Sequence, residues 1–180
     1  VSLAGTSIRG DSILQIQTKL IAESTGEKDA QLDLAYDYNL AIWDAVIASK
    51  NIKEFEKALE SVSNDFVKRF RKKKLIKKSE EREVIAAVKK TWLNPWMYEF
   101  IRYSPSMHIP NIACNVLVLI GSRDIQVTSK ENIRGYNDLL PKNGKLHLVK
   151  ELNGLNHLFQ NCKTCSISEY GQLEETFSTI

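Results

Sequence analysis

The chain has 180 residues, of which 43% are hydrophobic, and its formal net charge is +3 at pH 7. This length suits one medium domain or a domain with an insertion, and the hydrophobic fraction is sufficient for a core. A mildly basic charge says little about nucleic acid or membranes, and the sequence contains no run of about 18 apolar residues that would span a bilayer. We expect a soluble domain, and neither nucleic acid nor a membrane is predicted as its partner.

The first residues of the chain do not indicate the cellular compartment. The opening residues, VSLAGTSIRGD, contain neither an initial methionine nor a basic-then-apolar leader and are typical of the interior of a protein. A signal peptide upstream of Val1 would not be visible, so cytoplasmic, periplasmic and secreted locations all remain open.

Three cysteines are an odd and sparse set, which predicts reduced thiols rather than a disulfide framework. Cys162 and Cys165 form a CxxC pair, CKTC, but a zinc site needs a second close pair and a redox motif needs a preceding strand and a following helix. We read Cys114 as a small buried hydrophobe. The sequence predicts no metal and no cofactor.

The first part of the chain predicts one strand followed by helices. Residues 1–5 are short, apolar and end in glycine, which suits a buried strand. Residues 12–23 predict a helix capped by Ser12 that stops by Gly26. Apolar residues at three- and four-residue steps then predict three further helices, and a fourth short one, over 32–47, 52–70, 85–92 and 96–103.

The second part predicts strands separated by helices. The apolar run 115–121 is expected to be a strand buried on both faces of a parallel sheet. Residues 129–139 predict a helix capped by Ser129, residues 145–150 a strand, and residues 166–177 a final helix. This order predicts an α/β fold with about three parallel strands and flanking helices. Since one helix suffices for a crossover, the surplus predicts a helical cap at 28–103, inserted into a core formed by 1–27 and 104–180.

The segment 68–78, KRFRKKKLIKK, is strongly basic. Such a cluster can bind phosphates, but the charges surround the helix, acidic residues follow at once, and no aromatic ladder for stacking bases accompanies them. A solvated, projecting helix end is the favoured interpretation, and an anionic partner is the alternative. The basic residues are Lys68, Arg69, Arg71, Lys72, Lys73, Lys74, Lys77 and Lys78.

Two loops after predicted strands carry titratable side chains. Asp124 follows the strand that ends at Gly121, and His157 follows the strand 145–150. Neighbouring parallel strands lie about 4.8 Å apart, so their terminal loops can bring a carboxylate to an imidazole. The aspartate would accept the Nδ1 proton and orient the ring, leaving the other nitrogen as a general base.

The segments VLVLIGSRDIQV and GLNHLFQNC resemble the acid and histidine segments of the α/β-hydrolase superfamily, particularly capped bacterial esterases and serine-aminopeptidase-like hydrolases. Residues 94–105, NPWMYEFIRYSP, resemble the segment that joins cap to core in that family. The opening residues resemble the strand after the nucleophile helix. The resemblance implies the C-terminal half of a serine hydrolase that cleaves an ester or small amide by acyl transfer, with Asp124 and His157 as catalytic residues.

The family's G-x-S-x-G nucleophile motif does not occur in these 180 residues. Ser7 follows a strand, but Arg9 stands where the elbow needs a small residue; Ser24 has no strand before it. We therefore expect the nucleophile to lie upstream of Val1. The first strand would then present an unpaired apolar edge. We therefore expect the chain to pair with its N-terminal half, to self-associate as a homo-oligomer, or to be partly disordered.

The aromatic-rich residues Trp92, Trp96, Met97 and Phe100 have two interpretations: packing between cap and core, or an acyl pocket in which Trp96, Met97 and Phe100 bind substrate. We expect His108 on the surface or a pocket rim, and His147 in a structural role. The rival to the enzyme is a degenerate hydrolase-fold domain that binds a partner through residues 68–78.

Overall fold

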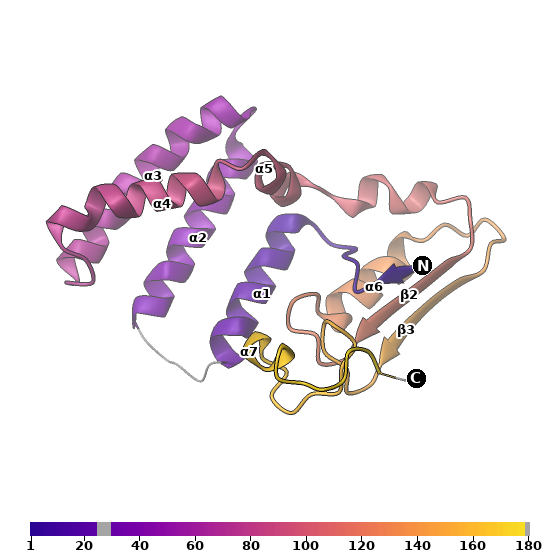
Figure 1. The fold of residues 1–180 in the computed structure, drawn as a ribbon. Coiled ribbons are helices and arrows are strands. Elements are labelled where there is room, and N and C mark those ends of the chain that lie inside the picture. The colour runs from indigo at the N-terminus through magenta and orange to yellow at the C-terminus, as the bar shows by residue number, and fades with distance from the viewer. Residues whose placement is uncertain (25–29, 179–180) are drawn as a thin grey trace. The chain divides into compact units, whose positions relative to one another are not determined.

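The structure is a computed structural model that describes residues 1–24 and 30–178 (Figure 1). The chain forms two compact units, one of Val1–Glu27 and Ser104–Ile180 and the other of Lys28–Tyr103. This division falls at the residues where the sequence predicts an insertion. The predicted helix stop at Gly26 lies outside the described residues. Within those residues, no helix is both long and apolar enough to cross a membrane.

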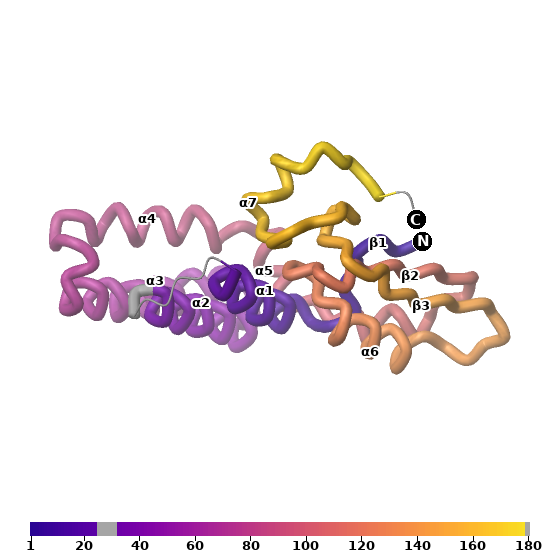
Figure 2. Tube along the Cα trace, turned by 90° about the horizontal axis from the view of Figure 1, so that it is seen from below, coloured from indigo at the N-terminus to yellow at the C-terminus, as the bar shows by residue number. Residues whose placement is uncertain are grey.

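The first unit is built on a parallel sheet of three strands in the order β1 (Ser2–Leu3), β2 (Val116–Gly121) and β3 (His147–Leu152). Gly121 pairs with Leu152, so β2 and β3 end at the same level. The helices of this unit are α1 (Gly10–Ser24), α6 (Ser129–Leu139) and α7 (Ile167–Tyr170), with short turns at Pro105–Met107 and Ile109–Asn111. Figure 2 shows α6 on one side of the strands and the segment with α7 on the other.

Alternation along β2 divides the core of this unit into two clusters. Val118 and Ile120 pack with Tyr136 of α6 and Ile109. Leu119 points to the opposite face and packs against a cluster formed by Leu152, Leu155 and Phe159. The loop after β3 therefore packs its apolar side chains against the sheet, and this packing fixes the position of the loop.

The second unit is helical. It contains α2 (Ala30–Ala48), α3 (Ile52–Lys72), a short turn at Lys78–Glu80, α4 (Glu81–Trp92) and α5 (Pro95–Arg102). The helix α3 packs against both α2 and α4. Asn51 caps α3 by accepting from the N–H groups of the first turn, and Asn94 does the same for α5.

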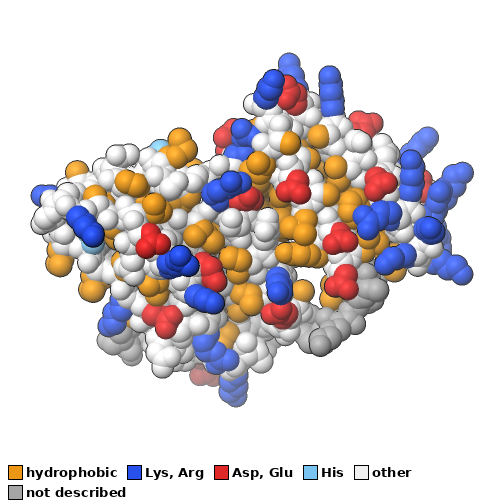
Figure 3. Space-filling view, turned by 180° about the vertical axis from the view of Figure 1, so that it is seen from behind, with side chains coloured by type: hydrophobic (Ala, Val, Ile, Leu, Met, Phe, Trp, Pro, Cys, Tyr) orange, Lys and Arg blue, Asp and Glu red, His pale blue; other side chains and the backbone are white. Residues whose placement is uncertain are grey.

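The basic segment is solvated, as expected. All eight Lys and Arg side chains of residues 68–78 are exposed, and Figure 3 shows such side chains projecting from the end of the helical unit, on the right of the view. Arg69 pairs with Asp37 at 3.7 Å and Arg71 with Glu81 at 3.1 Å. The Arg69–Asp37 pair is exposed on both sides and contributes little to stability.

Several predicted details of the elements are wrong. Helix α1 begins at Gly10 rather than after a Ser12 cap, and α6 has Thr128 at its N-cap with Ser129 as its first residue. The final helix covers only Ile167–Tyr170 instead of 166–177. Beyond it the chain returns to the loop after β3, where the Ser178 N–H donates to the Phe159 carbonyl at 2.8 Å rather than to a carbonyl of a longer helix.

Burial also differs from the prediction at three places. β1 is not buried: Leu3 is 53% exposed, Val1 before the strand is 89% exposed, and the outer edge of β1 has no strand partner among the described residues. β2 is only partly buried on its Leu119 face. Cys114 is exposed rather than a buried hydrophobe, since it lies before β2 begins.

The prediction of reduced thiols is wrong for the CxxC pair. Cys162 and Cys165 form a disulfide. The turn brings their Cα atoms to 5.0 Å, and Cys165 adopts a positive φ of 59° that folds the chain back on itself. The CxxC spacing in the sequence did not determine whether the two thiols pair.

Candidate active site

Asp124 is held by the turn that leaves β2. Its Oδ1 atom accepts the backbone N–H groups of Gln126 and Val127, both at 2.8 Å. The carboxylate is buried, with its side chain 0% exposed. Hydrogen bonds from N–H groups offset the cost of burying this charge, so the turn fixes Asp124 in one orientation.

His157 is held by the loop that leaves β3. This loop packs on the end of β2 so closely that a Cβ atom at Gly121 would lie 2.2 Å from the Leu155 carbonyl oxygen and 2.7 Å from that of Asn156. The backbone N–H of Arg123 also donates to the Leu155 carbonyl at 3.0 Å. The strand-ending glycine therefore permits the approach that brings His157 to the turn after β2.

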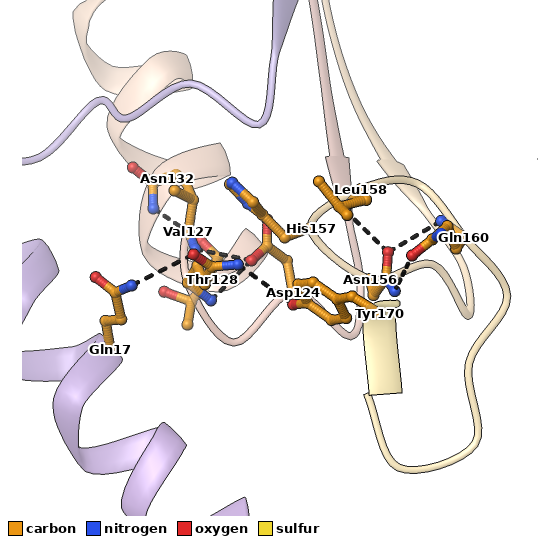
Figure 4. A network of polar contacts seen from close by, with 11 residues as sticks. Gln17, Asp124, Val127, Thr128, Asn132, Asn156, His157, Leu158, Gln160 and Tyr170 are labelled. Atoms are coloured by element: carbon orange, nitrogen blue, oxygen red, sulfur yellow. Dashed lines mark hydrogen bonds and ion pairs between the residues drawn. The ribbon is translucent and has the colours of Figure 1, made fainter. Parts of the chain in front are cut away.

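The two side chains meet. His157 Nδ1 lies 2.9 Å from Asp124 Oδ2, and Figure 4 shows the imidazole beside the carboxylate. Since a carboxylate only accepts, Nδ1 is the donor in this contact; in the neutral form of the ring, Nε2 on the far side would carry the lone pair. The His157 side chain is 27% exposed. This geometry can orient an imidazole as a base and stabilise its protonated form.

A buried amide pair frames the histidine loop. Asn156 is fully buried, and its side-chain oxygen accepts the N–H groups of Leu158 and Gln160 at 2.9 and 3.0 Å (Figure 4). Its NH2 donates to Gln160 Oε1 at 3.0 Å. Phe159 takes a positive φ of 58° within this turn. The residues on both sides of His157 are thus fixed by hydrogen bonds.

Tyr170 reaches the same place from α7. Its hydroxyl oxygen lies 3.4 Å from Gln126 Nε2. Burial raises the pKa of Tyr170 above its ordinary value, and the negative charge of Asp124 adds to the effect, whereas hydrogen bonds from Gln126 and the His157 backbone oppose it. The phenol therefore stays neutral beside the carboxylate at physiological pH.

Neither candidate serine of the chain is poised for attack. Ser7 is buried, and its hydroxyl donates to the Asn132 carbonyl at 2.7 Å. Ser24 is exposed near the end of α1 and donates to the Ile21 carbonyl at 2.7 Å. In both cases the hydroxyl proton is donated to a backbone carbonyl. That the nucleophile is neither of these serines stays a prediction.

The remaining predicted residues lie elsewhere. Trp96, Met97 and Phe100 are on α5 of the helical unit, where Trp96 stacks on Phe100 at 5.1 Å and is 65% exposed. Their role in substrate binding stays a prediction. His108 is exposed, as expected. His147 lies in β3 with both ring nitrogens buried. The described residues contain no group of three or more His, Cys, Asp or Glu that could hold a metal ion.

Sequence reasoning missed the residues that support the pair. An aspartate that follows a strand often accepts hydrogen bonds from the N–H groups two and three residues later, in an Asx turn. This signal was present in the sequence at Asp124. Asn156 beside His157 in a Gly/Asn-rich loop was a weaker signal. No sequence signal pointed to Tyr170, because its position near Asp124 depends on how the chain folds back after the disulfide.

Comparison of the chain with protein-family models, curated proteins and solved structures gave no match. The resemblance to hydrolases therefore depends on the sequence segments around Asp124 and His157.

Proposed function

We propose that this chain is the acid–base half of a serine hydrolase of the α/β-hydrolase type, with a helical cap formed by residues 28–103. The observation that carries the proposal is the 2.9 Å contact between His157 Nδ1 and the buried Asp124 carboxylate at the carboxyl ends of neighbouring parallel strands. A carboxylate and an imidazole in this relation are two of the three groups of a serine-hydrolase triad.

In the proposed reaction, a serine hydroxyl from outside these 180 residues attacks the carbonyl carbon of an ester or small amide. His157 Nε2 takes the hydroxyl proton as the new C–O bond forms. Asp124 keeps the Nδ1 proton in place and stabilises the imidazolium. The imidazolium then protonates the leaving alkoxide or amine, and a water molecule repeats the sequence to release the acid.

The proposed missing half would also complete the sheet. The outer edge of β1 has no strand partner among the described residues, and Leu3 and Leu148 of the sheet are about half exposed. Unpaired strand edges of this kind associate with other strands. In sedimentation velocity, the 180-residue chain alone is expected to self-associate, and co-expression with the upstream segment should replace this with one defined species. A stable, cooperatively unfolding monomer would contradict this part of the proposal.

A fluorophosphonate probe tests the nucleophile directly. The protein expressed from the complete open reading frame is treated with the probe, digested and mapped by mass spectrometry. One labelled serine upstream of Val1, whose labelling is slowed by His157→Ala but unaffected by His108→Ala, is the expected result. Labelling within residues 1–180, or none at all in folded protein, would refute the proposal.

A second candidate function depends on the basic segment. The eight exposed Lys and Arg side chains of residues 68–78 favour a polyanionic partner, and a glycine or alanine at the nucleophile position of the complete sequence would support this binding function over catalysis. Charge reversal at Lys73 and Lys74 should then abolish salt-sensitive binding to a heparin column, whereas reversal at Lys142 and Lys145 serves as the control.

A further inference from the structure

The loop that follows His157 is closed into a small ring. The disulfide joins Cys162 to Cys165, three residues apart. Cys165 is 2% exposed, whereas Cys162 is partly accessible. A reagent from solvent therefore meets the sulfur of Cys162 first.

Arg123 ties this ring to the turn that carries the acid. Its guanidinium donates to the carbonyl oxygens of Cys162 and Lys163, at 3.0 and 2.9 Å. Arg123 directly precedes Asp124 in the chain. Any change in the path of residues 162–163 therefore alters the contacts of the residue next to the buried carboxylate.

Glu169 ties the ring to α7. Its carboxylate accepts the backbone N–H groups of Lys163 at 2.8 Å, Thr164 at 2.9 Å and Cys165 at 2.6 Å, and the Thr164 hydroxyl at 2.7 Å. The Thr164 hydroxyl and these amides lower the pKa of Glu169 to about 2. The three successive N–H groups that converge on this carboxylate all belong to residues 163–165, within the ring that the disulfide closes.

Tyr170 is the next residue after Glu169, and it extends the connection to the site. Its hydroxyl lies against Gln126 Nε2, and Figure 4 shows its ring next to Asp124. Gln126 in turn donates its backbone N–H to the Asp124 carboxylate. The disulfide, the carboxylate of Glu169 and the phenol of Tyr170 thus form one continuous chain of contacts that ends at the acid–base pair.

We propose that the Cys162–Cys165 disulfide is a thiol-sensitive device that positions Tyr170 against the Asp124–His157 pair. The importance of this disulfide for catalysis rests on the proposed function, whereas the contacts described above do not depend on it. With the ring closed, Glu169 holds α7 in place and Tyr170 covers the pair. With the ring open, the three N–H groups no longer converge, α7 is released, and water gains access to His157. Tyr170 is a positioning residue in this scheme.

The redox step uses a dithiol as the reductant. One thiolate of the dithiol attacks Cys162 Sγ, forming a mixed disulfide and releasing Cys165 as a thiolate, which takes up a proton. The second thiol of the reagent then displaces Cys162, and the reagent leaves as a cyclic disulfide. Two electrons and two protons pass to the protein, which gains two thiols.

Two readouts on the full-length protein test the proposal without requiring activity. Hydrogen exchange measures the protection of the Lys163, Thr164 and Cys165 amides, and diethyl pyrocarbonate measures the accessibility of His157 by peptide mass spectrometry. All proteins carry Cys114→Ser, so that dithiothreitol acts only on the disulfide. The exposed His108 serves as the internal control for reagent reactivity.

On reduction, exchange at the three amides should become about twentyfold faster, the factor that corresponds to the closure entropy of a four-residue ring. Modification of His157 should accelerate several-fold, with His108 unchanged. The Cys162→Ser/Cys165→Ser double variant should reproduce both effects without reductant. Tyr170→Ala in the oxidised protein should accelerate only His157 modification and leave the three amides protected.

Faster amide exchange with unchanged His157 reactivity would overturn the proposal, as would no change in either readout. Neither measurement needs a substrate or a nucleophile. An inactive protein would therefore refute the proposed function while leaving this test intact.

Discussion

Replacing Gly121 by alanine should separate Asp124 from His157 without changing either residue. The new Cβ atom would lie 2.2 Å from the Leu155 carbonyl oxygen and 2.7 Å from that of Asn156, whereas ordinary contact begins at 3.4 Å. The clash is with backbone, so no side-chain rotation relieves it. The loop that carries His157 must therefore move by about 1 Å from the end of β2.

A shift of this size is sufficient to break the contact of His157 with Asp124. The contact is 2.9 Å, and hydrogen bonds of this type weaken beyond about 3.2 Å. Overpacking of this kind costs about 1–3 kcal/mol, and loss of a hydrogen bond to a charged group costs about 1.5–3 kcal/mol. Because both effects arise from one movement, we expect a decrease of about 3 kcal/mol in the free energy of unfolding.

Urea unfolding gives the free energy, and the downfield NMR signal of the His157 Nδ1 proton reports the contact. Gly171→Ala is the matched control, since a Cβ there meets no atom within 4 Å and its φ of −76° is one that alanine adopts freely. The control should change stability by less than about 0.5 kcal/mol and keep the signal. A Gly121→Ala protein as stable as wild type, with the Nδ1 signal intact, would refute this reasoning.

Three further predictions concern hydrogen bonds elsewhere: two near the candidate site and one in the helical unit. The folded pKa of Glu169 is about 2, against an ordinary 4.5. Protection of the residue 163–165 amides from hydrogen exchange should therefore be complete above pH 4.5 and be lost as pH falls toward 2. Glu169→Gln should show no such pH dependence, and a Glu169→Gln profile equal to that of wild type would contradict this role. Asn156→Ala removes three side-chain hydrogen bonds, two of them buried, and should cost at least about 2 kcal/mol in urea unfolding. A neutral result would show that the loop does not need this residue. Tyr38→Phe leaves the buried Ser63 hydroxyl without its 2.8 Å partner and should cost about 1–3 kcal/mol, part of which Ser63→Ala should restore in a thermal or urea melt.

Much of the fold follows from periodicity. The strand at Val116–Gly121 and the helices that begin near Ile52 and Ser129 lie close to their predicted limits, because each has a continuous apolar run or an amphipathic face. These signals are local. The same argument placed Asp124 and His157 at the ends of two parallel strands, and the structure brings them together.

The C-terminal segment resisted prediction because its structure depends on distant partners. Glu169 accepts hydrogen bonds from a turn closed by the disulfide, and residues after Gly171 bond to the loop after β3 instead of extending α7. No local pattern encodes these contacts. The exposure of β1 was missed for a similar reason, since burial of a strand depends on neighbours that its own residues do not specify.

Turnover of an activated ester by the protein from the complete open reading frame tests the central claim most directly. With p-nitrophenyl acetate, His157→Ala is expected to lower kcat/KM by on the order of 10³-fold or more, Asp124→Asn should show a comparably large loss, and His108→Ala should match wild type. Hydrolysis by His157→Ala at close to the wild-type rate would contradict the assignment of Asp124 and His157 as the acid–base pair.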